Sequence, residues 1–170
     1  ALVTIFLSQR QSSLTQDSKL SDYLNEPVWS FHTDDPITST PSQDGHTIYL
    51  RTSSSVLALD ALSGKQIWRV DLPAEASLSM SPYIVDEYIV VSEKGSRIAV
   101  INKESGTVIW KSAIIDTALT HSVTAEIQSI TSSNNTLYVA RFDWDLTAYN
   151  LQTGQVVWEQ NIPGRTNPYL

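Results

Sequence analysis

The fold of this 170-residue chain is decided by the stretch Ala58-Leu59-Asp60-Ala61-Leu62-Ser63-Gly64-Lys65-Gln66-Ile67-Trp68, because its pattern occurs twice more. A Gly followed by a Trp in the fourth position after it recurs without gaps at Gly64–Trp68, Gly106–Trp110 and Gly154–Trp158. Ser or Thr stands directly before each Gly, and Asp or Asn stands in the fourth position before it. The three Trp residues are 42 and 48 residues apart, a spacing typical of repeat units that contain several short strands.

Each unit also has a common feature upstream of its Gly. Thr40-Pro41 and Ser81-Pro82 stand at nearly the same distance before the Trp of their own units. Trp29 lies 39 residues before Trp68 and fits the end of an earlier unit, whereas Asn167-Pro168 fits the start of a later one. We therefore expect three units in the chain, with partial units at both ends.

Turn residues divide each unit into four short strands, and no window has the periodicity of a long amphipathic helix. In the turn before each Trp, Asp or Asn can bond to its own backbone and Gly supplies a positive φ. The expected strands are Ile37–Ser42, His46–Thr52, Val56–Asp60, Gln66–Asp71, Leu78–Val85, Tyr88–Ser92, Arg97–Asn102, Val108–Ala113, Val123–Ile130, Thr136–Phe142, Leu146–Asn150 and Val156–Asn161. The sequence predicts an all-β fold: a β-propeller fragment of about three four-stranded antiparallel blades.

The propeller part is expected to span residues 27–170, with blades near 37–71, 78–113 and 123–161. Residues 1–26 differ from it in composition. The apolar run Ala1–Leu7 is shorter than the roughly 20 residues that cross a bilayer, and Ser8–Glu26 is polar and rich in Ser and Gln. We interpret residues 1–26 as an N-terminal arm or linker, in which Ala1–Leu7 is either the remnant of a signal peptide or membrane anchor or an edge strand.

The stretch Ala58–Trp68 resembles the pyrroloquinoline quinone (PQQ)-type propeller repeat, whose consensus is Ala-Leu-Asp-x-x-Thr-Gly-x-x-x-Trp. The resemblance covers the chain from Val28 to its C-terminus, with mild departures at Val100, Asn102 and Asn150. It implies a ring of about seven or eight blades in which each Trp makes a blade-to-blade docking contact.

The resemblance does not extend to the cofactor site. Enzymes of this family hold the quinone with a vicinal disulfide, a stacking Trp and a calcium site, whereas this chain has no Cys and no matching ligand cluster that we can identify. We therefore expect no cofactor, and neither catalytic nor metal-binding residues, in this chain.

The charge balance narrows the class of partner. Lys and Arg total 11 against 18 Asp and Glu, which gives a net charge of −7. This argues against nucleic acid or an anionic membrane surface as the main partner, because both require a positive surface.

One loop is a candidate binding element. In Asp143-Trp144-Asp145, an aromatic side chain stands between two carboxylates in the expected turn between the second and third strands of the last blade. Such a loop can bind a cation or a partner protein, although an ordinary exposed turn with one packed ring explains it as well. His32, His46 and His121 fall in different units and lack the spacing of metal ligands.

These observations favour a non-catalytic β-propeller module for protein–protein scaffolding or sensing, with an extracytoplasmic location. The alternative is a fragment of a PQQ-dependent quinoprotein oxidoreductase whose cofactor site lies in other blades, and a third hypothesis is the sensor domain of a membrane receptor. The expected partner is another protein or further blades of the same protein, with self-association through the open ends and a membrane anchor upstream as additional hypotheses.

Overall fold

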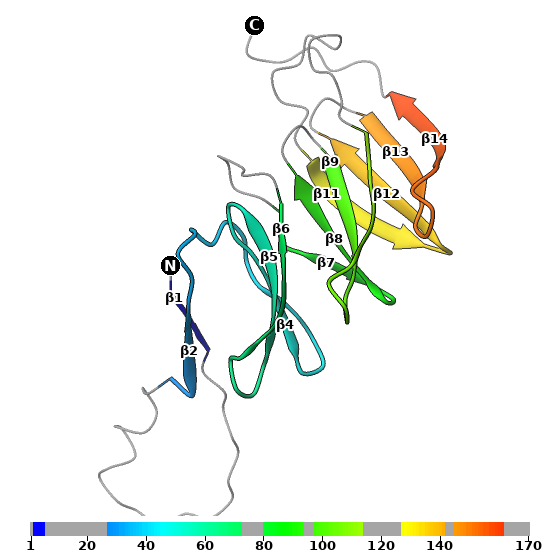
Figure 1. Ribbon diagram of the computed structural model, residues 1–170. Coiled ribbons are helices and arrows are strands. Elements are labelled where there is room, and N and C mark those ends of the chain that lie inside the picture. The colour runs from blue at the N-terminus through cyan, green and yellow to red at the C-terminus, as the bar shows by residue number, and fades with distance from the viewer. Residues whose placement is uncertain are drawn as a thin grey trace, which may run out of the picture.

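The computed structural model describes residues 2–5, 27–72, 80–93, 97–113, 127–141 and 145–161. The described residues form three four-stranded antiparallel sheets and one two-stranded sheet, joined by turns. The sheets follow one another in chain order, with the two-stranded sheet at the N-terminal end of the series (Figure 1). This arrangement confirms the predicted all-β fold of stacked propeller blades.

Each blade is a meander in which every strand pairs with the next one along the chain. The first blade contains β3 (Ser42–Asp44), β4 (Thr47–Arg51), β5 (Ser55–Asp60) and β6 (Gln66–Asp71). The second contains β7 (Tyr83–Val85), β8 (Tyr88–Glu93), β9 (Arg97–Asn102) and β10 (Val108–Lys111). The third contains β11 (Ile127–Ser133), β12 (Thr136–Arg141), β13 (Asp145–Asn150) and β14 (Val156–Asn161).

The first strand of each blade departs most from its predicted bounds. β3 begins directly after Pro41, whereas a strand was expected from Ile37, and β7 begins directly after Pro82. The predicted start of the latter strand at Leu78 lies outside the described residues. Proline has no N–H to donate to a sheet, which explains why regular pairing starts beyond it. Upstream of Pro41, Ile37 makes only an isolated bridge with Thr52.

The two-stranded sheet consists of β1 (Leu2–Ile5) and β2 (Trp29–His32). The strands are antiparallel, with Leu2 opposite His32 and Ile5 opposite Trp29. Of the three interpretations of Ala1–Leu7, the structure therefore shows a strand for residues 2–5. Residues 6–26 lie outside the described part of the chain.

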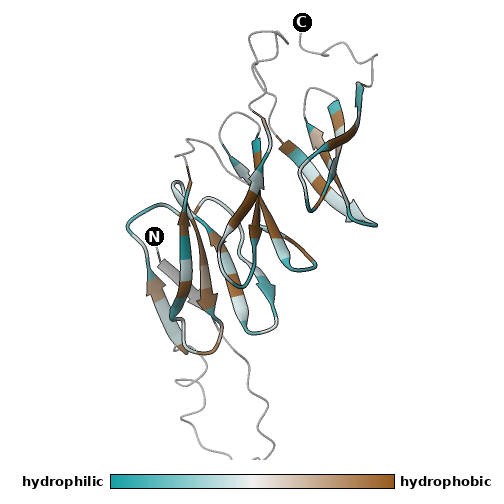
Figure 2. Ribbon diagram, turned by 45° about the vertical axis from the view of Figure 1, so that its right-hand side comes forward, coloured by the Kyte–Doolittle hydropathy of each residue, from teal (hydrophilic) through white to brown (hydrophobic). Residues whose placement is uncertain are grey.

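The core lies between blades rather than within a single sheet. Hydrophobic residues are concentrated on the strands (Figure 2). The two middle strands of each blade are the most buried. One cluster joins the first two blades through Tyr49, Ala58 and Trp68 on one side and Ile89 and Ile101 on the other. A second cluster joins the second and third blades, and a third lies between β2 and the first blade.

A β-bulge sits at the same place on the outermost strand of every blade. Leu59 pairs with Gln66 and Ala58 pairs with Trp68, so Ile67 is the extra residue. Ile109 and Val157 occupy the same position in the other blades. All three bulge residues are exposed, while the bulge redirects the following Trp toward one face of its sheet.

The turn before each Trp is closed by the side chain that begins it. In the first blade, the backbone N–H and the hydroxyl of Ser63 both donate to Asp60 Oδ1, at 2.7 and 2.6 Å. Asn102 and Asn150 make the same pair of bonds with Ser105 and Thr153. At this position an amide oxygen and a carboxylate oxygen therefore accept the same two hydrogen bonds and close the turn in the same way.

Because Asp60 is ionisable and the asparagines are not, only the turn of the first blade has a stability that depends on pH through this side chain. The bonds from Ser63 lower the pKa of the Asp60 carboxyl, so its stabilising contribution is complete above the unfolded-state pKa of about 3.9 and disappears as the pH falls through the folded-state pKa. We expect Asp60→Asn to keep the turn and remove this part of the acid sensitivity, as measured by urea midpoints between about pH 2 and about pH 6.

The reciprocal variant Asn102→Asp provides the control. It should introduce the same loss of stability on acidification into the second blade, where the introduced carboxylate would accept the two bonds that Ser105 donates. Identical acid profiles for the parent chain and both variants would contradict this account.

Candidate functional site

The blades are joined by a repeated contact between a Trp and the turn of the next blade. Trp68 Nε1 donates to the carbonyl of Lys103 at 3.0 Å, and its ring lies against Gly106. Trp29 Nε1 donates to the carbonyl of Ala61 at 2.9 Å, and its ring lies against Gly64. Trp110 Nε1 donates to the carbonyl of Leu151 at 2.7 Å, and its ring lies against Gly154. We call each such contact a seam.

The accepting residue of a seam is held from both sides. Lys103 donates its backbone N–H to the carbonyl of Glu87 in its own blade, while its carbonyl accepts from Trp68 of the preceding blade. The N–H groups of Ala61 and Leu151 bond in the same way to the carbonyls of His46 and Asn135. One peptide segment thus connects the two hairpins of its blade to the neighbouring blade.

The environments of the Trp residues differ along the chain. Trp68 is 9% exposed and Trp110 is half-buried, but Trp158 is 41% exposed. The fixed distance of each Trp from its turn Gly predicts that all three are largely buried, and for Trp158 this prediction is wrong. Trp29, Trp68 and Trp110 pack against the turn of the following blade, and Trp158 has no such turn among the described residues.

The seam between the first and second blades, formed by Trp68, carries additional polar contacts; we call it the first seam, and the seam formed by Trp110 between the second and third blades the second seam. Lys103 Nζ lies 2.6 Å from the Asp44 carboxylate, and Tyr49 Oη donates to the carbonyl of Lys103 at 3.3 Å. The hydrogen bond and charge of Asp44 raise the pKa of Lys103 above its usual value, and burial raises the pKa of the Tyr49 phenol. Lys103 is therefore tied to the first blade through both its backbone and its ammonium group.

Buried charged side chains lie at the C-terminal ends of β8 and β12, the second strands of the second and third blades. Glu93, with a fully buried side chain, lies 2.6 Å from Lys111 Nζ and 3.6 Å from Arg97. Arg141 donates to Thr147 Oγ1 at 2.7 Å and to Tyr149 Oη at 2.9 Å. The sequence alone does not indicate these groups as buried, since each stands at the end of a strand beside a predicted turn.

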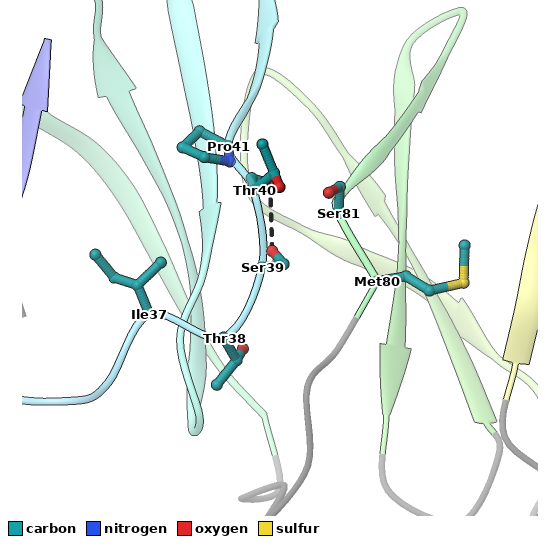
Figure 3. A pocket seen from close by; sticks show the side chains of 7 residues that line it. All are labelled: Ile37, Thr38, Ser39, Thr40, Pro41, Met80 and Ser81. Carbon is teal, nitrogen blue, oxygen red and sulfur yellow. Dashed lines mark hydrogen bonds between the residues drawn. The ribbon is translucent and has the colours of Figure 1, made fainter.

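A hollow of about 690 Å³ opens between the inner parts of the first two blades. Its lining consists of Ile37, Thr38, Ser39, Thr40, Pro41, Met80 and Ser81. In Figure 3 the hydroxyl of Ser81 points toward the segment that carries Ser39 and Thr40. Directly beyond the lining, Ser42 Oγ donates to the carbonyl of Pro82 at 2.6 Å, which fixes the two inner segments at one end of the hollow.

The chemistry of the hollow is neutral. Its side chains are hydroxyls and apolar groups, and none of the lining residues is titratable. Thr38 and Ser39 already donate to the backbone carbonyls of Arg51 and Thr40, both at 3.3 Å. This lining suits an uncharged group or a polypeptide backbone. Thr40, Pro41 and Ser81 belong to the repeated pairs Thr40-Pro41 and Ser81-Pro82, which the sequence indicated as a feature of the repeat and not as a binding site.

The loop predicted as a candidate binding element is only partly within the described structure. Asp143 and Trp144 lie outside the described residues, and Asp145 begins β13, where it pairs with Asn161. His32 and His46 are exposed on separate elements, and His121 also lies outside the described part. Among the described residues, no group of three or more His, Asp or Glu side chains is placed to hold a metal ion.

The described segments also contain no helix long and apolar enough to cross a membrane.

Comparison with known proteins places these observations in a family. A family model described as "Outer membrane protein assembly factor BamB" matches residues 20–168. BamB of Francisella tularensis is 25% identical over 137 residues, which cover 74% of this chain and 28% of that protein. The serine/threonine-protein kinase/endoribonuclease IRE1 of Oryza sativa is 26% identical over 159 residues, which cover 86% of this chain and 18% of that protein.

Solved structures share the fold. BamB from Moraxella catarrhalis matches with a TM-score of 0.61 at 22% identity, over 82% of this chain and 41% of that one. A europium-containing methanol dehydrogenase matches with a TM-score of 0.63 at 18% identity, over 80% of this chain and 27% of that one. The chain thus spans less than a third of the length of these curated relatives.

The seam geometry predicts that Gly154 is required for two separate reasons. Its φ of 71° strains any other residue, and a Cβ would lie 2.5 Å from the ring of Trp110. Gly45 is a matched control, because its φ is 55° but a Cβ there would meet nothing within 4 Å. We expect Gly154→Ala to lower the free energy of unfolding by about 1–3 kcal/mol more than Gly45→Ala, through overpacking of the seam. Equal losses in urea titrations would show that only backbone strain matters.

The seams also predict unequal costs for removing each Trp. Trp68→Ala should lower the free energy of unfolding by about 3–5 kcal/mol, because it leaves a cavity between two blades. Trp158→Ala should cost under about 1 kcal/mol, since this ring is 41% exposed and lacks a described acceptor. Urea titrations of the two variants test the difference, and a loss at Trp158 as large as that at Trp68 would refute it.

Proposed function

Because a single family model covers residues 20–168, the chain belongs to the family described as outer membrane protein assembly factor BamB, and we propose that it is a non-catalytic scaffold that binds other proteins. The propeller part is residues 27–170, and residues 1–26 are its N-terminal arm. The proposed location is extracytoplasmic, as the family description suggests for its members.

The observation that carries this proposal is the chemistry of the hollow. Acid–base catalysis requires titratable groups within hydrogen-bond reach of a substrate, whereas this lining is composed of hydroxyl and apolar side chains. Ser81 and Thr40 are exposed beside it and can exchange hydrogen bonds with the backbone of a bound segment. The hollow therefore fits an extended, uncharged stretch of a partner protein.

The acidic character of the chain supports the same kind of partner. A net charge of −7 disfavours nucleic acids and anionic lipid surfaces, but it is compatible with a protein. Since the chain spans 28% of the BamB relative and 18% of the IRE1 relative, assembly of outer membrane proteins and sensing by a receptor are both proposals for the whole protein. Of these, we favour assembly because the family model carries that description.

A crosslinking experiment tests whether the hollow binds protein. A photo-crosslinking benzoylphenylalanine in place of Ser81 should give a discrete protein adduct in the cells that naturally produce the chain. The same group in place of Glu104, which is exposed on the turn of the second blade, is the matched control and should give none. No adduct at Ser81 in folded protein, or the same adducts at both positions, would contradict the proposal.

The alternative, a fragment of a quinoprotein oxidoreductase whose cofactor site lies in other blades, can be tested here only for a quinone site that this chain would form by itself. If this chain contributed a quinone site of its own, added pyrroloquinoline quinone and calcium would remain bound through desalting. We expect no quinone absorbance on the protein after this treatment, because the neutral lining of the hollow offers no cationic group to the three carboxylates of the quinone. Retained absorbance at one quinone per chain would favour the oxidoreductase instead.

A further inference from the structure

Met80 carries the only sulfur atom of this 170-residue chain, because the sequence has one Met and no Cys. It lines the hollow together with Ser81, which follows it in the same blade. Its side chain is half-buried and packs against the cluster that joins the second and third blades. Figure 3 shows this side chain pointing away from the segment that carries Ser39 and Thr40. Met80 therefore connects the wall of the hollow to an apolar core cluster.

The backbone around Met80 is held by bonds to side chains rather than by a sheet ladder. The segment Met80–Pro82 lies before β7 and outside its pairing with β8. Met80 donates its N–H to Ser92 Oγ at 3.3 Å, and the carbonyl of Pro82 accepts from Ser42 Oγ at 2.6 Å. The place of Ser81 at the hollow thus depends on how its two neighbours are anchored, and one of these anchors is the packed side chain of Met80.

The surroundings of the Met80 side chain are apolar. The buried members of the cluster against which it packs are all aliphatic except Tyr149, and they include Val90, Ile98 and Ile127. A thioether suits this place because it is flexible and weakly polar, so it fills an irregular space without needing a hydrogen bond. A strongly polar group on the same side chain would lose its hydration there without gaining a donor, which is unfavourable.

Oxidation of the thioether by a peroxide introduces such a polar group. A lone pair of Met80 Sδ attacks one oxygen of hydrogen peroxide, the S–O bond forms and the O–O bond breaks. The departing oxygen keeps the electron pair of that bond and leaves as water with both protons of the peroxide, so the sulfur is oxidised by two electrons and the peroxide is reduced. The product, methionine sulfoxide, is returned to the thioether by methionine sulfoxide reductases.

We propose that Met80 is a sulfoxidation site through which a peroxide weakens the binding of a partner protein in the hollow, an inference that rests on the proposed function of the hollow. The sulfoxide leaves the cluster between the second and third blades because its oxygen has no donor there. The adjacent Ser81 moves with it and changes the wall of the hollow. A neutral lining holds a partner by shape and hydrogen bonds, so a displaced wall loses the partner.

The first test treats the purified chain with hydrogen peroxide and locates the added oxygen by peptide mass spectrometry. We expect one added oxygen, on Met80, in the folded protein. Hydrogen exchange of the Met80 amide, which is bonded to Ser92 Oγ, should become at least about tenfold faster, because this bond opens when the side chain leaves the cluster. Treatment with methionine sulfoxide reductases for both epimers should restore the slow exchange.

Two substitutions separate the sulfoxide from other effects of the peroxide. Met80→Leu keeps an apolar side chain of similar size without sulfur, and its amide exchange at position 80 should not change on treatment. Met80→Gln places a polar group on a side chain of similar length, and it should show the fast exchange without any peroxide. The indole N–H signals of Trp68 and Trp110 report in each sample that the blades remain folded.

The second test repeats the photo-crosslinking at Ser81 in producing cells exposed to hydrogen peroxide. The yield of the adduct should fall at least about fivefold relative to untreated cells. The same chain with Met80→Leu should show no such fall when it is compared with its own untreated sample. This comparison removes any effect of the peroxide on the partner, because the partner is the same in both strains.

The outcomes distinguish this inference from the proposed function. Oxidation of Met80 only after unfolding in urea would overturn the modification site. Equal treated-to-untreated ratios of adduct for the parent chain and Met80→Leu would overturn the control of binding. No adduct at Ser81 even in untreated cells would contradict the proposed function of the hollow, and the mass and exchange measurements would still decide whether Met80 is a modification site.

Discussion

The structure depends on the bond between an indole N–H and the carbonyl at the start of the next blade's turn. This bond requires the large Trp ring to lie flat against a backbone, and only glycine permits that approach. At Gly64, Gly106 and Gly154 the requirement is double, because the φ is positive and the space of a side chain is taken by the ring. The bulge before each Trp completes the arrangement by directing the ring toward the following blade.

Similar blades need not form identical seams. The first seam adds an ion pair between Asp44 and Lys103, whereas the second adds a hydrogen bond between the hydroxyls of Tyr83 and Ser132 at 3.1 Å. Because a partly exposed ion pair contributes little in water, the common Trp contact and the apolar clusters carry most of the stability. The polar additions distinguish one seam from the next.

The strand bounds predicted from the sequence are most accurate close to the Gly–Trp pattern and less accurate farther from it. β6, β9 and β14 have the predicted bounds because a turn with fixed chemistry lies next to each of them. The first strands were displaced because the predicted strands ran through Pro41 and Pro82, which have no N–H to donate to a sheet. The Gly was predicted as a turn residue, but its contact with the preceding Trp joins residues about 40 positions apart and is visible only in three dimensions. The burial of Glu93 and Arg141 was missed for a similar reason, since their partners lie on other strands.

The seams and the hollow are linked by geometry. A neutral lining holds a ligand by hydrogen bonds and shape, so its selectivity depends on a constant distance between the inner segments of two blades. The first seam holds these blades together through Trp68, and the bond from Ser42 to Pro82 fixes the inner segments beside the hollow. Residues that form the seams are constrained by packing between blades, whereas Ser39, Thr40 and Ser81 lie outside the core clusters. A propeller built in this way can keep its scaffold and change its partner by substitutions on the inner segments alone.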